Sequence, residues 1–86
     1  MNIAFSTLFK KSYNKLPSKI QIKVDEKIGI FTNDEFNSVL KNHKLHGVYA
    51  DFRSISITSD IRIVYRKVSK GDYIFHDIGT HSKLYE

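Results

Sequence analysis

Three short strand-like runs, of which the first two alternate between apolar and polar residues, dominate the second half of the chain and restrict the folds open to it. They cover residues 52–57, 61–66 and 73–78. Such alternation is typical of β-strands that bury one face. Ser59-Asp60 joins the first two runs, and Ser69-Lys70-Gly71-Asp72 is a strong turn sequence before the third. Consecutive strands with short connections predict an antiparallel β-meander.

The first half of the chain begins with a weak strand pattern, Asn2 to Ser6, and then changes to helical spacing. From about Leu8, apolar residues recur at helical intervals until Pro17, which ends one helix and suits the first turn of the next. Residues 32–34 are turn formers that end the second helix. The apolar stripe of that helix has i, i+4, i+8, i+11 spacing and consists of Ile20, Val24, Ile28 and Phe31.

These patterns predict an α+β fold, in which a short N-terminal strand and a helical hairpin pack on one face of the antiparallel meander. The 86 residues contain no cysteine. Two cores of about 40 residues each would normally need disulfides or metals, so we expect residues 1–86 to form a single domain. No apolar run is long enough to span a membrane, and the first residues lack the features of a signal peptide, so we expect a soluble, cytoplasmic protein.

The charge is positive and uneven. Fourteen Lys and Arg face nine Asp and Glu, giving +5. Residues 1–49 contribute eight lysines against four carboxylates, a local excess of +4. This balance favours an anionic partner such as a nucleic acid, with a merely solvated basic surface as an equal alternative. The same two interpretations apply to four lysines of the hairpin, Lys15, Lys19, Lys23 and Lys27.

Several titratable side chains are candidates for chemistry on the open face of the sheet. Histidines with a carboxylate, arginines and a tyrosine on a basic domain suit phosphodiester transfer without a metal. In that reaction a base deprotonates a ribose 2′-hydroxyl, cations stabilise the phosphorane, and an acid protonates the leaving 5′-oxygen. We expect neither a metal nor another cofactor, because the pair His43 and His46 has no third ligand at a convincing spacing. The alternative is that these groups are simply solvated; they are His43, His46, Asp60, Arg62, His76, Asp77, His81 and Tyr85.

Four motifs in a fixed order give a more specific indication. They are His43-Lys44-Leu45-His46-Gly47, Phe52-Arg53-Ser54-Ile55, the segment Ser59 to Tyr65, and the segment Gly79 to Tyr85. Together they resemble the RelE/ParE toxin superfamily, and most closely its YafQ branch, with the pattern H-x-L-x-G, [FY]-R, D-x-x-[IVL]-x-Y and G-[TS]-H-x-x-L-[FY]. The resemblance is dense over residues 43–85, whereas the helical hairpin matches in layout only.

The resemblance implies an mRNA interferase, the toxin of a type II toxin–antitoxin system. Such a toxin is an endoribonuclease that cleaves mRNA in the ribosomal A site and so blocks translation. The implied partners are a cognate antitoxin, the ribosome and mRNA, and the toxin alone is expected to be monomeric. Two alternatives remain open: a non-catalytic DNA gyrase inhibitor of the ParE type, and a degenerate relative that only binds its antitoxin.

The resemblance also carries individual residues. His43 and His81 match the active-site histidines, Asp60 the acidic residue, and Tyr85 the aromatic position near the chain end. We expect Asp60 and His81 to transfer protons, His43 to be an alternative base or to hold the phosphate, and Tyr85 to orient a base. Arg53 matches an arginine that the family keeps for phosphate contact or structural pairing. The expected RNA-binding residues are Lys44, Arg53 and Arg62 together with Lys15, Lys19, Lys23 and Lys27.

Three positions depart from the YafQ pattern. Ser56 stands where the family has a histidine on the second strand, Asp77 where it has an arginine, and Ile61 where it has an aromatic residue. The substitution at Asp77 is expected to replace a cation that faces the phosphate by an anion. Arg62 lies on the same sheet face as Asp60 by alternation and is expected to supply the missing charge.

Overall fold

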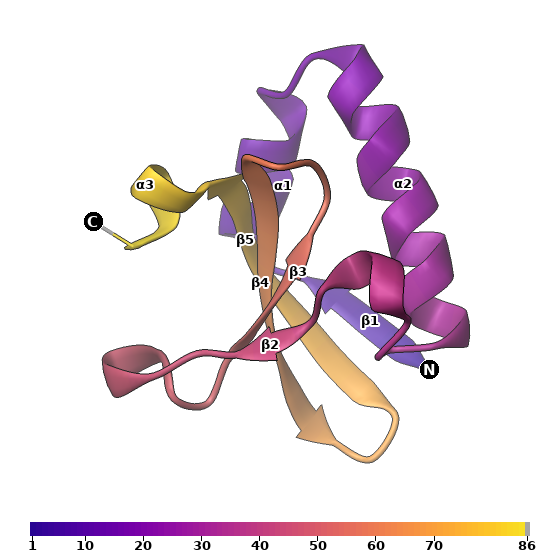
Figure 1. Ribbon diagram of the computed structural model, residues 1–86, viewed down its shortest axis with the longest axis vertical. Helices are drawn as coiled ribbons and strands as arrows, with labels where there is room; N and C mark the ends of the chain where they lie inside the picture. The colour runs from indigo at the N-terminus through magenta and orange to yellow at the C-terminus, as the bar shows by residue number, and fades with distance from the viewer. Residues whose placement is uncertain (86) are drawn as a thin grey trace.

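In the computed structural model, which describes residues 1–85, helices pack on a five-stranded sheet, and a short last helix follows the final strand (Figure 1). The strand order is β1-β5-β4-β3-β2, with β1 parallel to β5 and all other neighbours antiparallel. The strands are β1 (Asn2–Phe5), β2 (His43–Lys44), β3 (Arg53–Ser56), β4 (Ile61–Ser69) and β5 (Asp72–Thr80). The helices are α1 (Thr7–Asn14), α2 (Ser18–Asn33) and α3 (His81–Tyr85), with 3₁₀ turns η1 (Ser38–Leu40) and η2 (Gly47–Tyr49).

Ser6 and Pro17 determine where the two helices of the hairpin begin. The Ser6 hydroxyl accepts the Phe9 N–H (2.9 Å) and caps α1. Pro17 is the N-cap of α2, and its carbonyl accepts the Ile20 N–H (2.9 Å). The predicted break at Pro17 is therefore confirmed, as is the end of the helix at residue 33. Lys15 caps the end of α1 and so lies outside the lysine register of α2.

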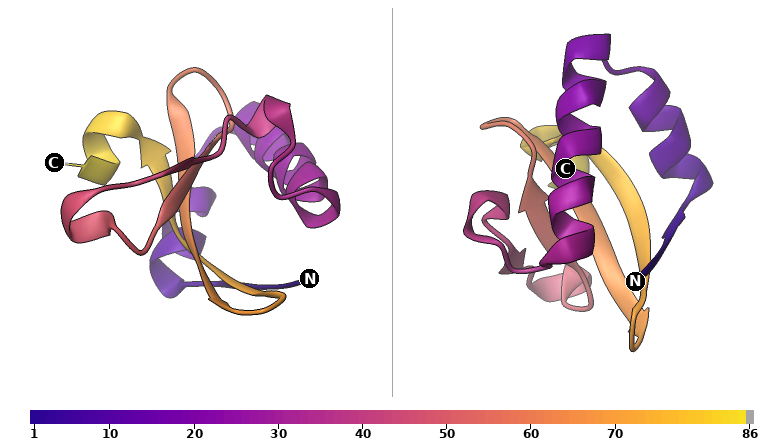
Figure 2. Two further views of the ribbon diagram at one scale, coloured as in Figure 1. Left: turned by 60° about the horizontal axis from the view of Figure 1, so that its bottom comes forward. Right: turned by 90° about the vertical axis from the view of Figure 1, so that its right-hand side faces the viewer.

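The core lies between the hairpin and one face of the sheet (Figure 2). Cross-strand pairing puts Ile63 opposite both Ile55 and Ile78, on a common face. Phe31 of α2 is fully buried against that face and makes edge-on contacts with three aromatic rings at centroid distances of 4.9–5.3 Å. Phe9 of α1 belongs to the same cluster. Both helices thus cover one sheet face, and the predicted α+β fold is confirmed.

A β-bulge in β5 changes the outcome for Asp77. Val64 pairs with Asp77 and Tyr65 with Phe75, which leaves His76 as an extra residue. The Asp77 carboxylate is buried and accepts hydrogen bonds from the Ser12 hydroxyl (2.7 Å) and the Ile78 N–H (2.8 Å). The expectation that this anion faces the phosphate is therefore wrong, because Asp77 anchors α1 to the sheet.

The long connection from α2 to β3 is fixed by a polar network that no sequence pattern indicated. Tyr65 donates to one Glu35 oxygen (2.7 Å) and Tyr73 to the other (3.0 Å). Asn42 donates to the Tyr65 hydroxyl (2.7 Å) and accepts from Arg53 Nε (2.7 Å). We call these five residues the Glu35 cluster. The cluster holds the segment before β2 against the sheet and so fixes where His43 begins its strand.

The helices of residues 1–85 are all too short or too polar to cross a bilayer.

Candidate active site

A small polar hollow opens where strand β2, the first residues of strand β4 and helix α3 meet. Its cavity volume is about 180 Å³, and polar atoms make up most of its surface. It brings together residues from the first, third and fourth sequence motifs. We call it the histidine pocket; it is lined by His43, Leu45, His46, Tyr49, Arg62, His81 and Tyr85.

Helix α3 delivers two of the predicted residues. His81 is its first residue and Tyr85 its last, one turn later, so both side chains lie on one face of the helix. Their rings meet edge to face with centroids 4.7 Å apart. The Thr80 hydroxyl accepts the Lys83 N–H (3.2 Å) at the start of the helix. This helical turn holds the His81 imidazole at the end of the sheet.

His43 reaches the pocket from the other side. It lies on β2 opposite Ser54 of β3, and therefore on the sheet face away from the hydrophobic core residues Ile55 and Ile63. Its Nδ1 is 3.2 Å from the Lys41 carbonyl oxygen, an interaction in which the ring nitrogen carries the proton. His43 and His81 thus line one pocket although 38 positions separate them in the chain.

Arg62 is the only lysine or arginine in residues 1–85 that lines this pocket. It lies between Ser56 and Gly79 in the sheet register, on the same face as His43. Its Nη1 donates to the Ser56 hydroxyl at 2.7 Å. The serine that replaces the family's histidine therefore holds a cation, and the expectation that Arg62 brings charge to the site agrees with its position.

Tyr85 presents an unusual hydroxyl. Its ring packs edge-on against Tyr49, with centroids 5.8 Å apart, while its hydroxyl oxygen is buried without a partner among the described residues. An unpaired buried hydroxyl costs about 1–3 kcal/mol.

Asp60 lies beside the pocket rather than in it. It is exposed in the turn before β4, and its N–H donates to the Thr58 hydroxyl (3.2 Å). The pairing of Ile61 with Thr80 puts Asp60 and His81 at the same end of the sheet. The structure shows no hydrogen bond between them within residues 1–85 and does not include Asp60 among the residues that line the pocket.

Arg53 and Lys44 are not brought to the pocket. Lys44 of β2 lies opposite Arg53 of β3, and Arg53 lies opposite Tyr65 of β4. These positions alternate with His43 and Ser54 along their strands, so they lie on the other face of the sheet. The Arg53 guanidinium lies 5.1 Å from the Phe36 ring centroid and bonds to Asn42 within the Glu35 cluster. The family keeps this arginine for phosphate contact or for structural pairing, and in this structure it has the structural role.

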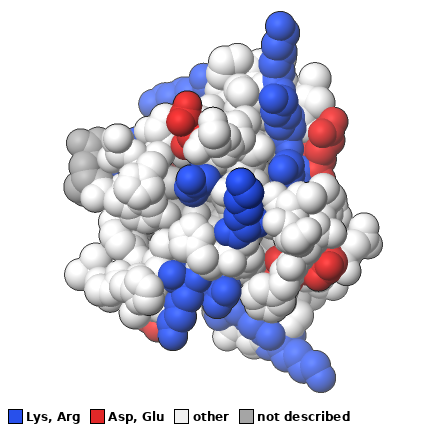
Figure 3. Space-filling view, in the orientation of Figure 1, with Lys and Arg blue, Asp and Glu red and all other residues white. Residues whose placement is uncertain are grey.

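The hairpin lysines divide into two sets. Lys15, Lys19 and Lys23 are exposed, and Lys and Arg side chains run along α2 in Figure 3. Lys27 is half-buried and lines a separate hollow of about 390 Å³ between α2, η1 and the β3–β4 turn. We call this hollow the basic groove; it is lined by Lys27, Val39, Lys41, Ser56, Ile57, Thr58, Ser59 and Arg62.

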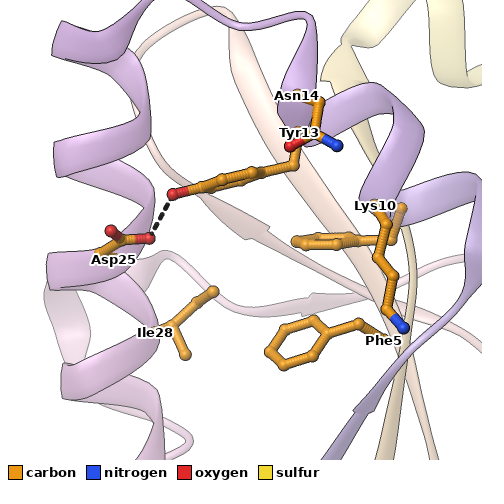
Figure 4. Close-up of a pocket in the computed structure, with 7 residues that line it drawn as sticks. Phe5, Lys10, Tyr13, Asn14, Asp25 and Ile28 are labelled. Carbon is orange, nitrogen blue, oxygen red and sulfur yellow. Dashed lines mark hydrogen bonds between the residues drawn. The ribbon is translucent and has the colours of Figure 1, made fainter.

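A third hollow, of about 420 Å³, is mostly apolar and lies between β1, α1 and α2 (Figure 4). Tyr13 crosses it and donates to Asp25 (2.8 Å), and this bond to a carboxylate is the main reason that the pKa of Tyr13 is raised. Lys10 lies at its edge. The sequence pattern of the hairpin had indicated only the apolar residues of this hollow, and these as part of the core. We call this hollow the apolar groove; it is lined by Phe5, Phe9, Lys10, Tyr13, Asn14, Asp25 and Ile28.

The sequence did not single out Leu45 and Tyr49 for the pocket. It named His46 among the titratable candidates for chemistry and as one histidine of a possible metal pair, without giving it a role in the reaction. No group of three or more His, Asp or Glu side chains within residues 1–85 is placed to hold a metal ion. The H-x-L-x-G motif did contain a usable indication, since His43 and His46 both line the pocket.

Solved structures with the same fold define the class of protein. The crystal structure of YafQ from E. coli strain BL21(DE3) has a TM-score of 0.84 and 20% identity, covering 99% of this chain and 98% of that one. The YoeB/ParE toxin from Agrobacterium tumefaciens has a TM-score of 0.81 and 21% identity, covering 94% and 99%. The YafQ chain of the E. coli DinJ–YafQ toxin–antitoxin complex has a TM-score of 0.80 and 21% identity, covering 99% and 97%. The fold is that of the small RelE-like toxins.

The family follows from the sequence match. The model described as "Bacterial toxin of type II toxin-antitoxin system, YafQ" matches residues 1–86. The chain therefore belongs to the YafQ family of type II toxins, and the resemblance seen in the four motifs is confirmed. No curated protein sequence matches it.

Proposed function

We propose that this toxin is a ribosome-dependent endoribonuclease that cleaves mRNA by metal-independent transesterification. The observation that carries the proposal is the histidine pocket, in which three imidazoles and one guanidinium line a single hollow. In the reaction a base takes the 2′-hydroxyl proton, and the 2′-oxygen attacks the adjacent phosphorus. The bond to the 5′-oxygen breaks, an acid protonates that oxygen, and a 2′,3′-cyclic phosphate remains.

Each side chain has a role that suits its chemistry. His81 transfers one proton, since an imidazole titrates near neutral pH. For the other proton the geometry favours His43, which lines the pocket, over Asp60, which lies beside it. Arg62 stabilises the charge that develops on the phosphorane, and the Ser56 hydroxyl fixes its guanidinium. Tyr85 orients an RNA base, a contact worth about 1–3 kcal/mol when an aromatic ring stacks on a base.

The decisive experiment is His81→Ala, measured by single-turnover cleavage on programmed ribosomes. Losing a general acid or base typically costs about 10²–10⁴-fold in rate. Because His81 is exposed, its loss should change the free energy of unfolding by no more than about 0.5 kcal/mol. His76→Ala is the matched control, since His76 is exposed on the neighbouring strand outside the pocket. A full-rate His81→Ala protein would remove His81 from the chemistry.

Expression without an antitoxin separates the cleavage proposal from the other toxin activities. An interferase should stop growth by blocking translation and leave mRNA ends inside translated codons. Growth arrest with intact mRNA and altered DNA supercoiling would identify a gyrase inhibitor of the ParE type. A chain that binds an antitoxin and leaves growth unchanged would be a degenerate relative.

We also propose a cognate antitoxin as partner, as in the E. coli DinJ–YafQ complex. The local excess of +4 on residues 1–49 favours an acidic antitoxin segment, and the apolar groove lies in the same half and offers apolar anchors such as Phe5 and Ile28. Binding should weaken as salt rises. An affinity that is equal at low and high salt would leave the apolar anchors as the main source of binding.

The ribosome and mRNA are the other proposed partners, which places the toxin in the cytoplasm. Lys15, Lys19 and Lys23 are exposed away from the pocket and are proposed to orient the toxin on ribosomal RNA. Charge reversal at Lys19 and Lys23 should weaken ribosome binding and leave the choice of cut site unchanged. A changed codon preference would assign these lysines to the mRNA instead.

A further inference from the structure

The basic groove is positively charged without compensation. Three of its eight lining residues are cations, and none is an acid. They come from three separate parts of the chain, with Lys27 on α2, Lys41 after η1 and Arg62 on β4. Figure 3 shows Lys and Arg side chains in the middle of this face, over the region of η1, β3 and β4, apart from those along α2. Three like charges around one hollow repel each other, and a bound anion relieves that repulsion.

The groove adjoins the histidine pocket at Arg62. This arginine lines both hollows, and the Ser56 that holds its guanidinium lines the groove as well. A ligand that lies in the pocket against Arg62 is therefore next to the groove, with Arg62 as the residue common to both hollows.

Lys41 has a backbone conformation that its side chain does not explain. Its φ is +49°, the only positive φ of a non-glycine residue within residues 1–85. Glycine or asparagine adopts this region more readily than lysine does. The Lys41 side chain is exposed, so the fold gains nothing from packing it. Lys41 is the left-handed C-cap of η1, and this cap puts the lysine in the lining of the groove.

Hydroxyl groups complete the lining. Thr58 Oγ1 accepts the N–H groups of Asp60 (3.2 Å) and Ile61 (3.0 Å), which leaves its own proton to donate to a ligand. Ser59 lies beside it in the same turn. Lysines, an arginine and hydroxyl donors are the groups that contact phosphate oxygens in nucleic-acid complexes.

We propose that the basic groove binds the phosphate backbone of single-stranded RNA next to the bond that is cut, with Lys27 and Lys41 as its phosphate ligands. This inference rests on the proposed endoribonuclease function, because it extends the path of the RNA out of the histidine pocket. An acidic peptide would also satisfy the charge. The position of the groove next to the pocket at Arg62 favours RNA, since a polynucleotide held in the pocket has further phosphates that can contact a neighbouring hollow.

The test measures binding separately from cleavage. The probe is a short single-stranded RNA with 2′-O-methyl groups at every ribose, which has no 2′-hydroxyl nucleophile. Its affinity is measured against salt for the wild type, Lys27→Gln, Lys41→Gly and the double variant. Each lost phosphate contact should lower the slope of log K against log salt by about 0.7, so the double variant should lose about 1.4. Lys70→Gln removes the same charge from the β4–β5 turn, outside the groove, and should leave the slope unchanged.

Lys41→Gly separates binding from folding. Glycine adopts a positive φ without strain, so this variant should unfold at the same urea concentration as the wild type or a higher one. Weaker RNA binding by a protein of equal stability then reports the lost ammonium group. An unchanged salt slope in the double variant would overturn the proposal, as would an equal loss in Lys70→Gln.

The outcome is independent of whether the toxin cuts RNA. If the wild type binds the methylated RNA through Lys27 and Lys41 yet leaves mRNA intact on ribosomes, the proposed cleavage fails and the groove stands. If the wild type cleaves mRNA and the double variant binds and cleaves equally well, the groove fails and the cleavage stands. A double variant that keeps its RNA affinity and loses affinity for the antitoxin would assign the groove to the antitoxin instead.

Discussion

Ser56→Ala tests whether the serine acts through Arg62. The substitution removes the hydroxyl that accepts Arg62 Nη1 at 2.7 Å. Hydrogen bonds to charged groups contribute about 1.5–3 kcal/mol, and the half-buried guanidinium places this one at the lower end. We therefore expect single-turnover cleavage on programmed ribosomes to slow about tenfold, since about 1.4 kcal/mol corresponds to a factor of ten.

The role of the serine is isolated by a double-mutant cycle. Arg62→Gln removes the only guanidinium of the pocket and should slow cleavage by about 10²–10³-fold, the usual loss for one group that stabilises a developing anion. If Ser56 acts only by holding Arg62, then Ser56→Ala has no further effect in the Arg62→Gln protein. The coupling energy should equal the whole effect of the serine variant, about 1.4 kcal/mol.

Two further variants make the test specific. Ser56→Thr keeps a hydroxyl and suits a strand, so it should retain most of the wild-type rate. Ser54→Ala is the matched control on the same strand, because the Ser54 hydroxyl is fully buried without a partner and its loss should leave the rate unchanged. Equal effects of Ser56→Ala with and without Arg62 would refute the reasoning, as would full activity of Ser56→Ala.

Three stability predictions follow from other contacts. Asp77→Ala leaves the Ile78 N–H and the Ser12 hydroxyl without their acceptor and should lower the urea-measured free energy of unfolding by about 2–4 kcal/mol, with the cleavage rate per folded molecule retained; an unchanged urea midpoint would contradict the structural role of this carboxylate. Gly71→Ala should cost about 1 kcal/mol in the same measurement because its φ is +79°, and a neutral effect would mean that the turn readily changes conformation. Burial, followed by the Glu35 carboxylate, raises the pKa of Tyr65, so the unfolded chain releases this proton first as pH rises. Stability should therefore fall above about pH 10 by up to about 1.4 kcal/mol per pH unit, and Tyr65→Phe should flatten the decline; equal slopes for both proteins would contradict the assignment.

The sequence by itself determined the elements and their order. Alternation predicted β3 and β4, and the turn sequence at residues 69–72 with the run after it predicted β5. Pro17 marked the break between α1 and α2. The stripe through Val24 and Phe31 predicted the buried face of the hairpin, and both residues are fully buried. These features depend on local periodicity and on the backbone limits of single residues, which a chain carries before it folds. The four motifs also indicated the YafQ family, which the full-length match confirmed.

The tertiary structure decided which side chains meet. The bulge at His76 buried Asp77, and strand register put Ser56 beside Arg62 and turned Arg53 to the opposite face. A bulge or a one-residue shift in register moves the side chains that follow in the strand to the opposite face of the sheet. The alternation of residues within one strand does not reveal such a shift. Helix α3 and strand β2 meet only because the sheet brings their ends together. The sequence motifs therefore named residues of the histidine pocket, and the strand order brought those residues together. The basic groove depends on packing between α2, η1 and the β3–β4 turn. Within its own stretch of sequence, each cation of the groove has the pattern of an ordinary solvated surface residue.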